Sequence, residues 1–306
     1  MNQRHFVIGA GPVGTHVAAR LADMGAHVTV ATRSGSHTGI EGVVHTRVDA
    51  ADPEALTSAA RGADIIYNCA NPGDYTSWQR VWPPLAASIL QAAVRNEAVL
   101  AITGNLYPYG PVTVPMTEDL PDAAADAKGV LRGRMWADAL TAHRAGDVRA
   151  VEVRGSDYVG PGIGANGHVS RQLYAMARGK RLWVMGSADQ PHSWTDVGDM
   201  AAALIAAAAD EDAHGQIWFA PTNRPRSQRE ALHDVAEAAG FAEPRVAGIP
   251  SSALAVSAWF SPMVRELRAL EYQWTRPYIM DDRRSRNQLG LEPTPWDEVC
   301  RRTAGG

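Results

Sequence analysis

The feature that most constrains the fold is a glycine-rich stretch near the start of the chain, Gly9-Ala10-Gly11-Pro12-Val13-Gly14. It follows a short apolar run, Phe6 to Ile8, that is typical of a buried strand, and it precedes a pattern that predicts a helix over residues 12–24. Glycines at this spacing let the backbone approach a pyrophosphate, and the helix N-terminus offers it free N–H groups. We therefore predict a dinucleotide site that includes Gly9, Gly11, Pro12, Val13 and Gly14.

Short apolar runs alternate with helical patterns over the first half of the chain. Further strands are expected at 27–31, 43–48, 63–69, 99–103 and 149–153, with helices that include 85–95 and 132–143. This alternation predicts a doubly wound parallel sheet, a Rossmann fold, over residues 1–158. After residue 159 the pattern changes. A smaller C-terminal α/β lobe is expected over residues 159–306, with chain segments free to interleave with the first domain.

Composition excludes several classes of protein. A net charge of −4 argues against nucleic-acid binding and against a polybasic membrane anchor. Cys69 and Cys300 are the only cysteines and have no partners at metal-ligand spacing, so neither a disulfide framework nor a metal site is expected. The longest apolar run, Met200 to Ala209, is too short to span a bilayer, and the first apolar stretch is too short for a signal peptide. These features predict a soluble, cytoplasmic protein.

The end of the second predicted strand addresses the choice between NAD(H) and NADP(H). It reads Thr32-Arg33-Ser34, with no carboxylate where NAD-binding proteins usually place one. A guanidinium binds a 2′-phosphate in a bidentate fork, so Arg33 between two hydroxyl donors favours NADP(H). The alternative is that Arg33 is a solvated surface residue. Asp49, followed by Ala50, is placed to accept from the adenine amino group or simply to make a turn.

Four further segments carry a family resemblance. They are Asn68-Cys69-Ala70, Leu106 to Pro111, Arg154 to Pro161, and Trp194 to Asp199. In order and spacing the chain resembles the short-chain dehydrogenase/reductase superfamily, in its extended, epimerase/dehydratase-type branch. The resemblance implies NAD(P)-dependent oxidoreductase activity on a small molecule. It also suggests a homodimer through the helices after strands four and five. The cofactor contacts that it implies are Cys69, Ala70, Asn71 and Thr103.

The chain departs from that family at its active site. The reductases carry a Tyr-x-x-x-Lys pair on the helix after strand five, but residues 128–138 contain no tyrosine. The register that we prefer puts Val130 at the tyrosine position and Arg134 at the lysine position, where Arg134 would hold the nicotinamide ribose. The family serine is replaced by Gly104 or Asn105.

Replacement chemistry is expected from the loop after strand five. Tyr107 is the first candidate for an acid, and Asn105 for polarising a carbonyl. Arg134 would lower the pKa of Tyr107 if the two lay close together. The alternative is that Tyr107 is only an aromatic wall of the pocket or part of the core.

Aromatic residues predict the character of the substrate. Loops at the carboxyl edge of the sheet would bring together Tyr75, Trp78, Trp136 and Trp194, with Asp157 and His168 as polar contacts. Such a pocket favours a flat or apolar substrate over a nucleotide-sugar. Arg171, Arg178, Lys180 and Arg181 keep the nucleotide-sugar open, and the aromatic residues can instead be core.

Three functions follow as hypotheses. The first is an NADP(H)-dependent oxidoreductase acting on a small aromatic or apolar molecule without the usual catalytic pair. The others are a non-catalytic NADP-binding sensor or scaffold, and a non-redox isomerase or cyclase.

Overall fold

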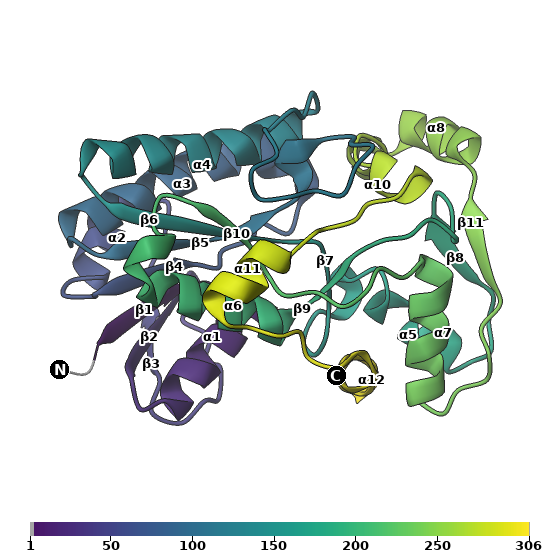
Figure 1. Cartoon of the computed structure of the whole chain (residues 1–306), viewed down its shortest axis with the longest axis horizontal. Helices are drawn as coiled ribbons and strands as arrows, with labels where there is room; N and C mark the ends of the chain where they lie inside the picture. Colours follow the sequence, from purple (N-terminus) through teal and green to yellow (C-terminus); the bar gives the residue numbers. More distant parts are fainter. Residues whose placement is uncertain (1–2, 306) are drawn as a thin grey trace.

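The large domain is built on a seven-stranded, wholly parallel sheet. The computed structural model describes residues 3–305, and Figure 1 shows helices covering both faces of this sheet. The strand order is β3-β2-β1-β4-β5-β6-β10. The strands are β1 (Arg4–Ile8), β2 (His27–Thr32), β3 (Val44–Arg47), β4 (Ile65–Asn68), β5 (Val99–Asn105), β6 (Arg149–Gly155) and β10 (Ile217–Phe219). The predicted doubly wound Rossmann fold is confirmed.

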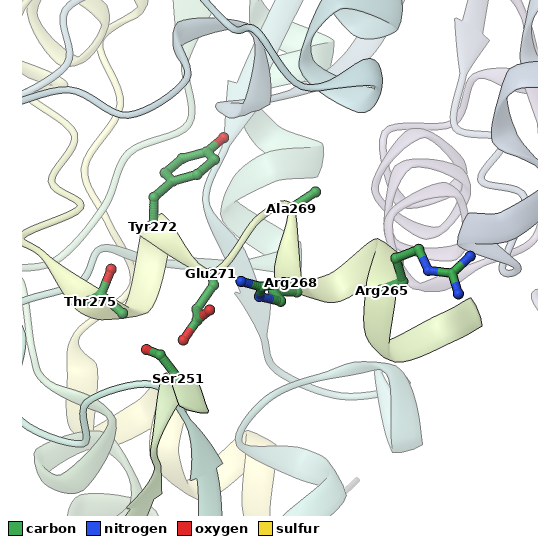
Figure 2. A pocket seen from close by; sticks show the side chains of 7 residues that line it. All are labelled: Ser251, Arg265, Arg268, Ala269, Glu271, Tyr272 and Thr275. Atoms are coloured by element: carbon green, nitrogen blue, oxygen red, sulfur yellow. The ribbon is translucent and has the colours of Figure 1, made fainter. Parts of the chain in front are cut away.

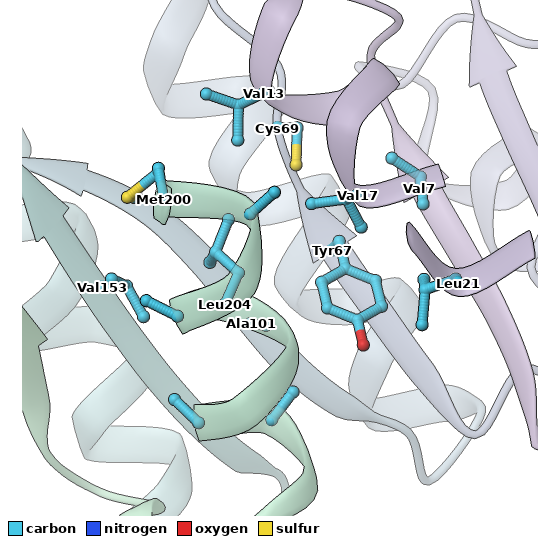
Figure 3. Close-up of a cluster of buried hydrophobic side chains, with 14 of the residues drawn as sticks. Val7, Val13, Val17, Leu21, Tyr67, Cys69, Ala101, Val153, Met200 and Leu204 are labelled. Carbon is cyan, nitrogen blue, oxygen red and sulfur yellow. The ribbon is translucent and has the colours of Figure 1, made fainter. Parts of the chain in front are cut away.

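Alternating strand residues supply the two cores. On one face, Val7, Tyr67 and Val153 pack against α1 (Pro12–Asp23) and α6 (Val197–Ala209), as Figure 3 shows. On the other face, Phe6 and Leu100 pack against α2 (Pro53–Ala59), α3 (Trp78–Arg95) and α4 (Ala127–Ala145). Because successive side chains of a strand point to opposite faces, strands buried on both sides are mostly apolar, although β6 also buries Glu152 and Arg154.

Two helices are longer than the sequence pattern predicts. α3 begins at Trp78 rather than at Leu85 and continues through Pro83 and Pro84. The prolines remove two backbone donors, but burial of the helix face that carries Trp78 and Trp82 stabilises the early turns. α4 begins after Asp126, whose carboxylate accepts from two backbone N–H groups of the first turn.

The second lobe carries a two-stranded parallel sheet of β8 (Leu182–Met185) and β11 (Val246–Ile249). Between the lobes, β7 (Asp157–Val159) pairs with β9 (Trp194–Asp196). The lobe's helices are α5 (Leu173–Met176), α7 (Gln228–Ala238), α8 (Ser251–Phe260), α9 (Pro262–Arg268), α10 (Tyr272–Thr275) and α12 (Trp296–Gly305). α5 is a single turn of α-helix and directly follows the 3-10 turn Ser170–Gln172.

The chain passes repeatedly between the two lobes. After β9 it returns to the large domain, where α6 packs on α1 and β10 extends the main sheet beside β6. α11 (Arg283–Leu289) also lies against α6. A cut at residue 158 thus separates the lobes only approximately, because the C-terminal half supplies an edge strand and a helix layer to the sheet. Within residues 3–305, no helix is long and apolar enough to cross a membrane.

Trp136 lies in the core, which corrects its expected place in the substrate pocket. Its side chain is buried in the cluster between the sheet, α3 and α4, together with Leu131, Met135 and Ala139. Trp136 lies on the face of α4 that packs against the sheet. It is one helical turn beyond Arg132.

We predict that Trp136→Ala lowers the free energy of unfolding by about 3–5 kcal/mol, because it removes a large buried side chain and leaves a cavity. Urea denaturation followed by circular dichroism measures the loss. Cofactor affinity of the folded variant should be unchanged. Weakened cofactor binding with an unchanged free energy of unfolding would instead show that Trp136 lines the pocket.

Candidate functional site

The glycine loop has the backbone geometry that close approach to a ligand requires. Gly9 has φ +101°, and a Cβ there would lie 2.9 Å from the Cys69 carbonyl oxygen. A Cβ at Gly14 would lie 2.0 Å from the Gly9 carbonyl oxygen, so α1 packs directly against the loop. At Gly11 a Cβ would meet nothing within 4 Å. Gly9 and Gly14 are therefore needed for packing, whereas Gly11 faces open space.

The helix that follows the loop begins with unused donors. Gly11 caps α1 without a side-chain hydrogen bond, and Pro12 occupies the first turn. Val13 is buried in the core beneath the loop. The N–H groups and the positive dipole end of α1 therefore point toward the open space above Gly11, which suits a pyrophosphate.

The end of β2 presents hydroxyls and cations. Arg33 and Ser34 are exposed, and the Arg33 carbonyl accepts from Arg47 Nε at 3.1 Å. Thr32 Oγ1 accepts from the Ser36 backbone N–H at 3.1 Å, and the Ser34 and Ser36 hydroxyls are 2.6 Å apart. No carboxylate occurs between Thr32 and Gly39. The loop is thus held in a turn that exposes two guanidinium-bearing residues beside hydroxyl groups.

The adenine-side candidates are arranged as a turn. The carboxylate of Asp49 accepts from the Ala51 backbone N–H at 3.0 Å, and Ala50 is buried. One carboxylate oxygen of Asp49 is therefore used in the turn. The exposed position of the group leaves the other oxygen accessible.

The ends of β4 and β5 form the next part of the site. Asn68 accepts from the Ala70 N–H at 3.3 Å and so shapes the turn that carries Cys69 and Ala70. The Thr103 hydroxyl donates to the buried Cys69 sulfur at 3.6 Å. Asn71 follows and is exposed. The structure thus gathers Cys69, Ala70 and Thr103 beside the glycine loop.

The preferred register of the α4 motif is wrong. Val130 is 53% exposed and Arg134 is also exposed, so both lie on the outer face of α4. Lys128 and Arg132, with the same i,i+4 spacing, are buried on the inner face. Arg132 Nη2 donates to the Thr103 carbonyl oxygen at 2.5 Å. Arg132 therefore reaches the end of β5, where Arg134 was expected, whereas Arg134 points outward and lies away from the site.

Two buried polar atoms in this region have no hydrogen-bond partner within residues 3–305, and a bound cofactor could supply one to each. Neither Arg132 Nε nor the Tyr158 hydroxyl has a hydrogen-bond partner among the described residues. The charge of Arg132 lowers the pKa of Tyr158, and Tyr158 in turn raises the pKa of Arg132, so the two groups interact electrostatically. A buried unpaired donor is costly, so a ligand with hydroxyl groups between them would satisfy both.

A buried ion pair explains the missing family serine. Glu152 Oε2 accepts from Arg154 Nε at 3.0 Å on β6, the strand beside β5. A Cβ at Gly104 would lie 2.7 Å from Glu152 Oε1 and 2.8 Å from Arg154 Cγ. Gly104 therefore has no room for a side chain, and Asn105 is the first residue that can reach the site. Its amide oxygen accepts from the Tyr107 N–H at 3.2 Å, which leaves its NH₂ group as the donor.

Tyr107 faces a second phenol. The hydroxyls of Tyr75 and Tyr107 are 3.0 Å apart. The Tyr75 ring stacks on buried Trp78, with centroids 4.8 Å apart and planes at 11°. Burial, the neighbouring Tyr75 and the charge of Asp157 raise the pKa of Tyr107 well above its usual value. Tyr107 is therefore a neutral phenol near pH 7.

Asp157 is held between two histidines. Its Oδ2 lies 2.9 Å from His192 Nε2, and its Oδ1 lies 3.5 Å from His168 Nε2. The His192 ring stacks on Trp274 at 4.0 Å. Burial lowers the pKa of His168 to about 4, so this ring is neutral at pH 7. Although burial alone would raise the pKa of Asp157, His168 and the His192 hydrogen bond hold it below its usual value.

The structure thus brings together most, but not all, of the expected pocket. Tyr75 and Tyr107 meet directly, Trp78 supports them, and Asp157 meets His168. Trp194 is buried behind His192, with ring centroids 4.9 Å apart, so it belongs to the supporting layer. Trp136 does not reach the site.

Sequence reasoning missed several residues here. Lys128, Arg132, Tyr158, Trp274 and Tyr278 were not among the expected site residues. The Lys128-x-x-x-Arg132 spacing matches the family's Tyr-x-x-x-Lys as well as Val130 and Arg134 do, so spacing alone could not choose between the two registers. Trp274 and Tyr278 gave no signal, since only the tertiary fold brings them to His192.

Comparison with known proteins is decisive for the family. The model of the NAD dependent epimerase/dehydratase family matches residues 6–219, about two thirds of the chain. The chain belongs to this family. Membership of the epimerase/dehydratase family makes it an NAD-dependent enzyme of the short-chain dehydrogenase/reductase type. No curated protein matches the chain.

Solved structures share the fold across nearly the whole chain. MoeE5 in complex with UDP-glucose and NAD has a TM-score of 0.80 at 19% identity, covering 99% of this chain and 97% of its own. A UDP-glucose 4-epimerase from Thermotoga maritima has a TM-score of 0.81 at 16% identity, covering 99% and 98%. WbmH of Bordetella bronchiseptica, in complex with NAD⁺, has a TM-score of 0.77 at 17% identity, covering 100% and 98%.

We predict that Arg132→Met weakens cofactor binding by about 10- to 100-fold, the equivalent of one charge-assisted hydrogen bond. Arg134→Met, the matched control on the outer face, should change affinity by less than about twofold. Arg132→Lys keeps the charge and should recover most of the affinity. Fluorescence titration measures all three. Equal effects of the Arg132 and Arg134 changes would contradict the observed register.

Proposed function

We propose that this enzyme is an NADP(H)-dependent oxidoreductase that acts on a small apolar or aromatic molecule. The observation that carries the proposal is the pair of buried, unpartnered donors, Arg132 Nε and the Tyr158 hydroxyl, at the carboxyl end of the sheet. We propose that one extended nucleotide satisfies these donors at one end and the N-terminus of α1, where a Cβ at Gly11 would meet nothing within 4 Å, at the other. When bound, the nicotinamide would supply or accept a hydride.

The preference for NADP(H) rests on the end of β2. Arg33 is exposed, Arg47 reaches its backbone, and the Ser34 and Ser36 hydroxyls lie alongside. A 2′-phosphate carries negative charge and accepts several hydrogen bonds, so this set favours it over a free hydroxyl. Asp49 is proposed to accept from the adenine amino group with its free carboxylate oxygen.

We predict that Arg33→Ala weakens NADPH binding by at least about tenfold and leaves NADH binding within about twofold, because the lost charge-assisted bonds reach only the 2′-phosphate. Calorimetric titration with each nucleotide measures the change. Arg61→Ala is the control. Arg61 is also exposed, but it precedes β4 and so lies at the amino end of the strands, whereas Arg33 follows the carboxyl end of β2. A parallel loss of NADH affinity would show that Arg33 does not select between the cofactors.

Substrate activation is proposed for the side chains above the nicotinamide position. Tyr107 remains a phenol and donates a hydrogen bond to the substrate oxygen or nitrogen, while the Tyr75 hydroxyl holds it at 3.0 Å. The Asn105 NH₂ group is a second donor for the same atom. Two neutral donors stabilise charge that develops during hydride transfer without a tyrosinate base.

An apolar substrate is proposed because charged side chains of the site are already engaged by protein partners. Lys128 is paired with Glu266, and Asp157 is hydrogen-bonded to His192. The remaining walls are the aromatic rings of Tyr75, Trp274 and Tyr278. With Lys128 and Asp157 engaged in this way, these walls offer a substrate mainly apolar contact. Compounds with a polarisable C=O or C=N bond beside a ring are the first to screen against NADPH consumption.

We predict that Tyr107→Phe lowers kcat by about 10²- to 10³-fold, the usual cost of one lost donor to a developing charge. NADPH affinity should not change. Tyr109→Phe is the matched control, because the Tyr109 ring is buried against Arg154 and Phe219 and does not face the site. Steady-state kinetics with the substrate found in the screen measure both. Full activity of Tyr107→Phe would remove Tyr107 from the reaction.

A second candidate is a non-redox isomerase or cyclase on the same fold. It is favoured by the absence of tyrosine from α4, which removes the usual proton carrier of the reductases. The two candidates differ in one observable. Net NADPH consumption equal to product formed supports the reductase, whereas turnover without net change in NADPH absorbance supports the isomerase.

A further inference from the structure

α8 and α9 form an apolar hairpin on the outside of the second lobe, at its upper right in Figure 1. Trp259 and Phe260 are each 83% exposed, and Val256 and Met263 are exposed beside them. Of the ten exposed large apolar side chains in the described part of the chain, these four fall within eight residues. The other six are scattered from Met24 to Trp183. We call the four residues the hairpin patch.

α8 is rich in apolar residues and yet is exposed along almost its whole length. Its sequence, SSALAVSAWF, contains no charged residue, yet Ala258 is the one residue of α8 that is buried. A helix that is apolar around its whole circumference is expected in a core or against a lipid surface. Contiguous apolar exposure of this kind marks a surface that binds something else.

The charged residues around the hairpin patch indicate the sign of the charge that a partner's surface should carry. Residues 244–265 contain no aspartate or glutamate but include Arg245 and Arg265. Arg265 and Arg268 line a cavity of about 590 Å³ at the base of the hairpin. In Figure 2, Arg268 lies near Glu271 and Ser251, whereas Arg265 points away from them. Glu266 is paired with Lys128 and Glu271 is buried, so the exposed charge at the hairpin base is positive.

We propose that the α8–α9 hairpin docks on an anionic phospholipid surface. Trp259 and Phe260 enter the interface, where aromatic side chains prefer to lie, and Arg265 and Arg268 meet the lipid phosphates. A second copy of the chain fits this surface less well. A two-fold contact would bring the same arginines together, and Glu266, the carboxylate between them on α9, is already paired with Lys128.

The docked surface adjoins the candidate site. Glu266 of α9 pairs with Lys128 of α4, and α9 packs against the 3-10 turn Tyr75–Ser77. The hairpin therefore forms one wall over Tyr75, and docking places this wall at the lipid surface. The overall charge of −4 does not oppose docking, because the contact needs two local cations and apolar insertion rather than a polybasic segment.

Co-sedimentation of the full chain with vesicles tests the proposal. Binding is expected to vesicles of phosphatidylglycerol mixed with phosphatidylcholine, and it should be much weaker to pure phosphatidylcholine. Trp259→Ser with Phe260→Ser should lower partitioning at least about tenfold. Arg265→Gln and Arg268→Gln should each lower it about fivefold, more at low salt than at high salt. Trp183→Ser, at an exposed tryptophan of β8, is the matched control and should bind as the wild type does.

The readout does not depend on catalysis, so it is separate from the proposed function. Circular dichroism confirms that each variant is folded. Failure of the wild type to bind anionic vesicles would overturn the proposal. So would a fall in solution mass on Trp259→Ser with Phe260→Ser without vesicle binding, because that result would make the hairpin a contact between copies of the chain.

Discussion

The candidate site depends on a guanidinium buried beneath the carboxyl end of β5. Arg132 reaches from α4 to the Thr103 carbonyl oxygen and thereby fixes the helix to the end of the strand. Its burial is tolerated because Glu152 lies close enough to favour the charged form, and Glu152 is itself held by Arg154. Removing one partner of such a network leaves an uncompensated buried charge. Loss of any one of these three residues is therefore expected to destabilise the protein.

The buried charged residues Arg132, Glu152 and Arg154 limit which side chains can line the site. Glu152 and Arg154 fill the space beside Gly104, so a serine side chain cannot occupy that position. The inner face of α4 is taken by Lys128 and Arg132, so the tyrosine of the reductases has no equivalent there. The groups that can activate a substrate consequently come from other elements, the turn before α3 and the loop after β5, where Tyr75 and Tyr107 meet.

Much of the large domain could be predicted because its signals are local. The glycine loop, the alternation of strands with helices and the absence of a carboxylate after β2 are all readable within a few residues. The register of α4 was not predictable, because Val130 with Arg134 and Lys128 with Arg132 have equal spacing. The apolar pattern misleads there, since the helix buries two cations and exposes a valine. Likewise, the partners of Asp157 lie 11 and 35 residues further along the chain, so only tertiary packing brings the three together.

The central claim is that one nucleotide extends from Gly11 to the unpartnered donors of Arg132 and Tyr158. A crystal structure of the protein grown with NADP⁺ tests it most directly. The account predicts density for the pyrophosphate at the N-terminus of α1, the 2′-phosphate beside Arg33, and the nicotinamide ribose within hydrogen-bond distance of Arg132 Nε and the Tyr158 hydroxyl. A bound nucleotide whose ribose lies away from Arg132, with Arg132 Nε still unpartnered, would contradict it.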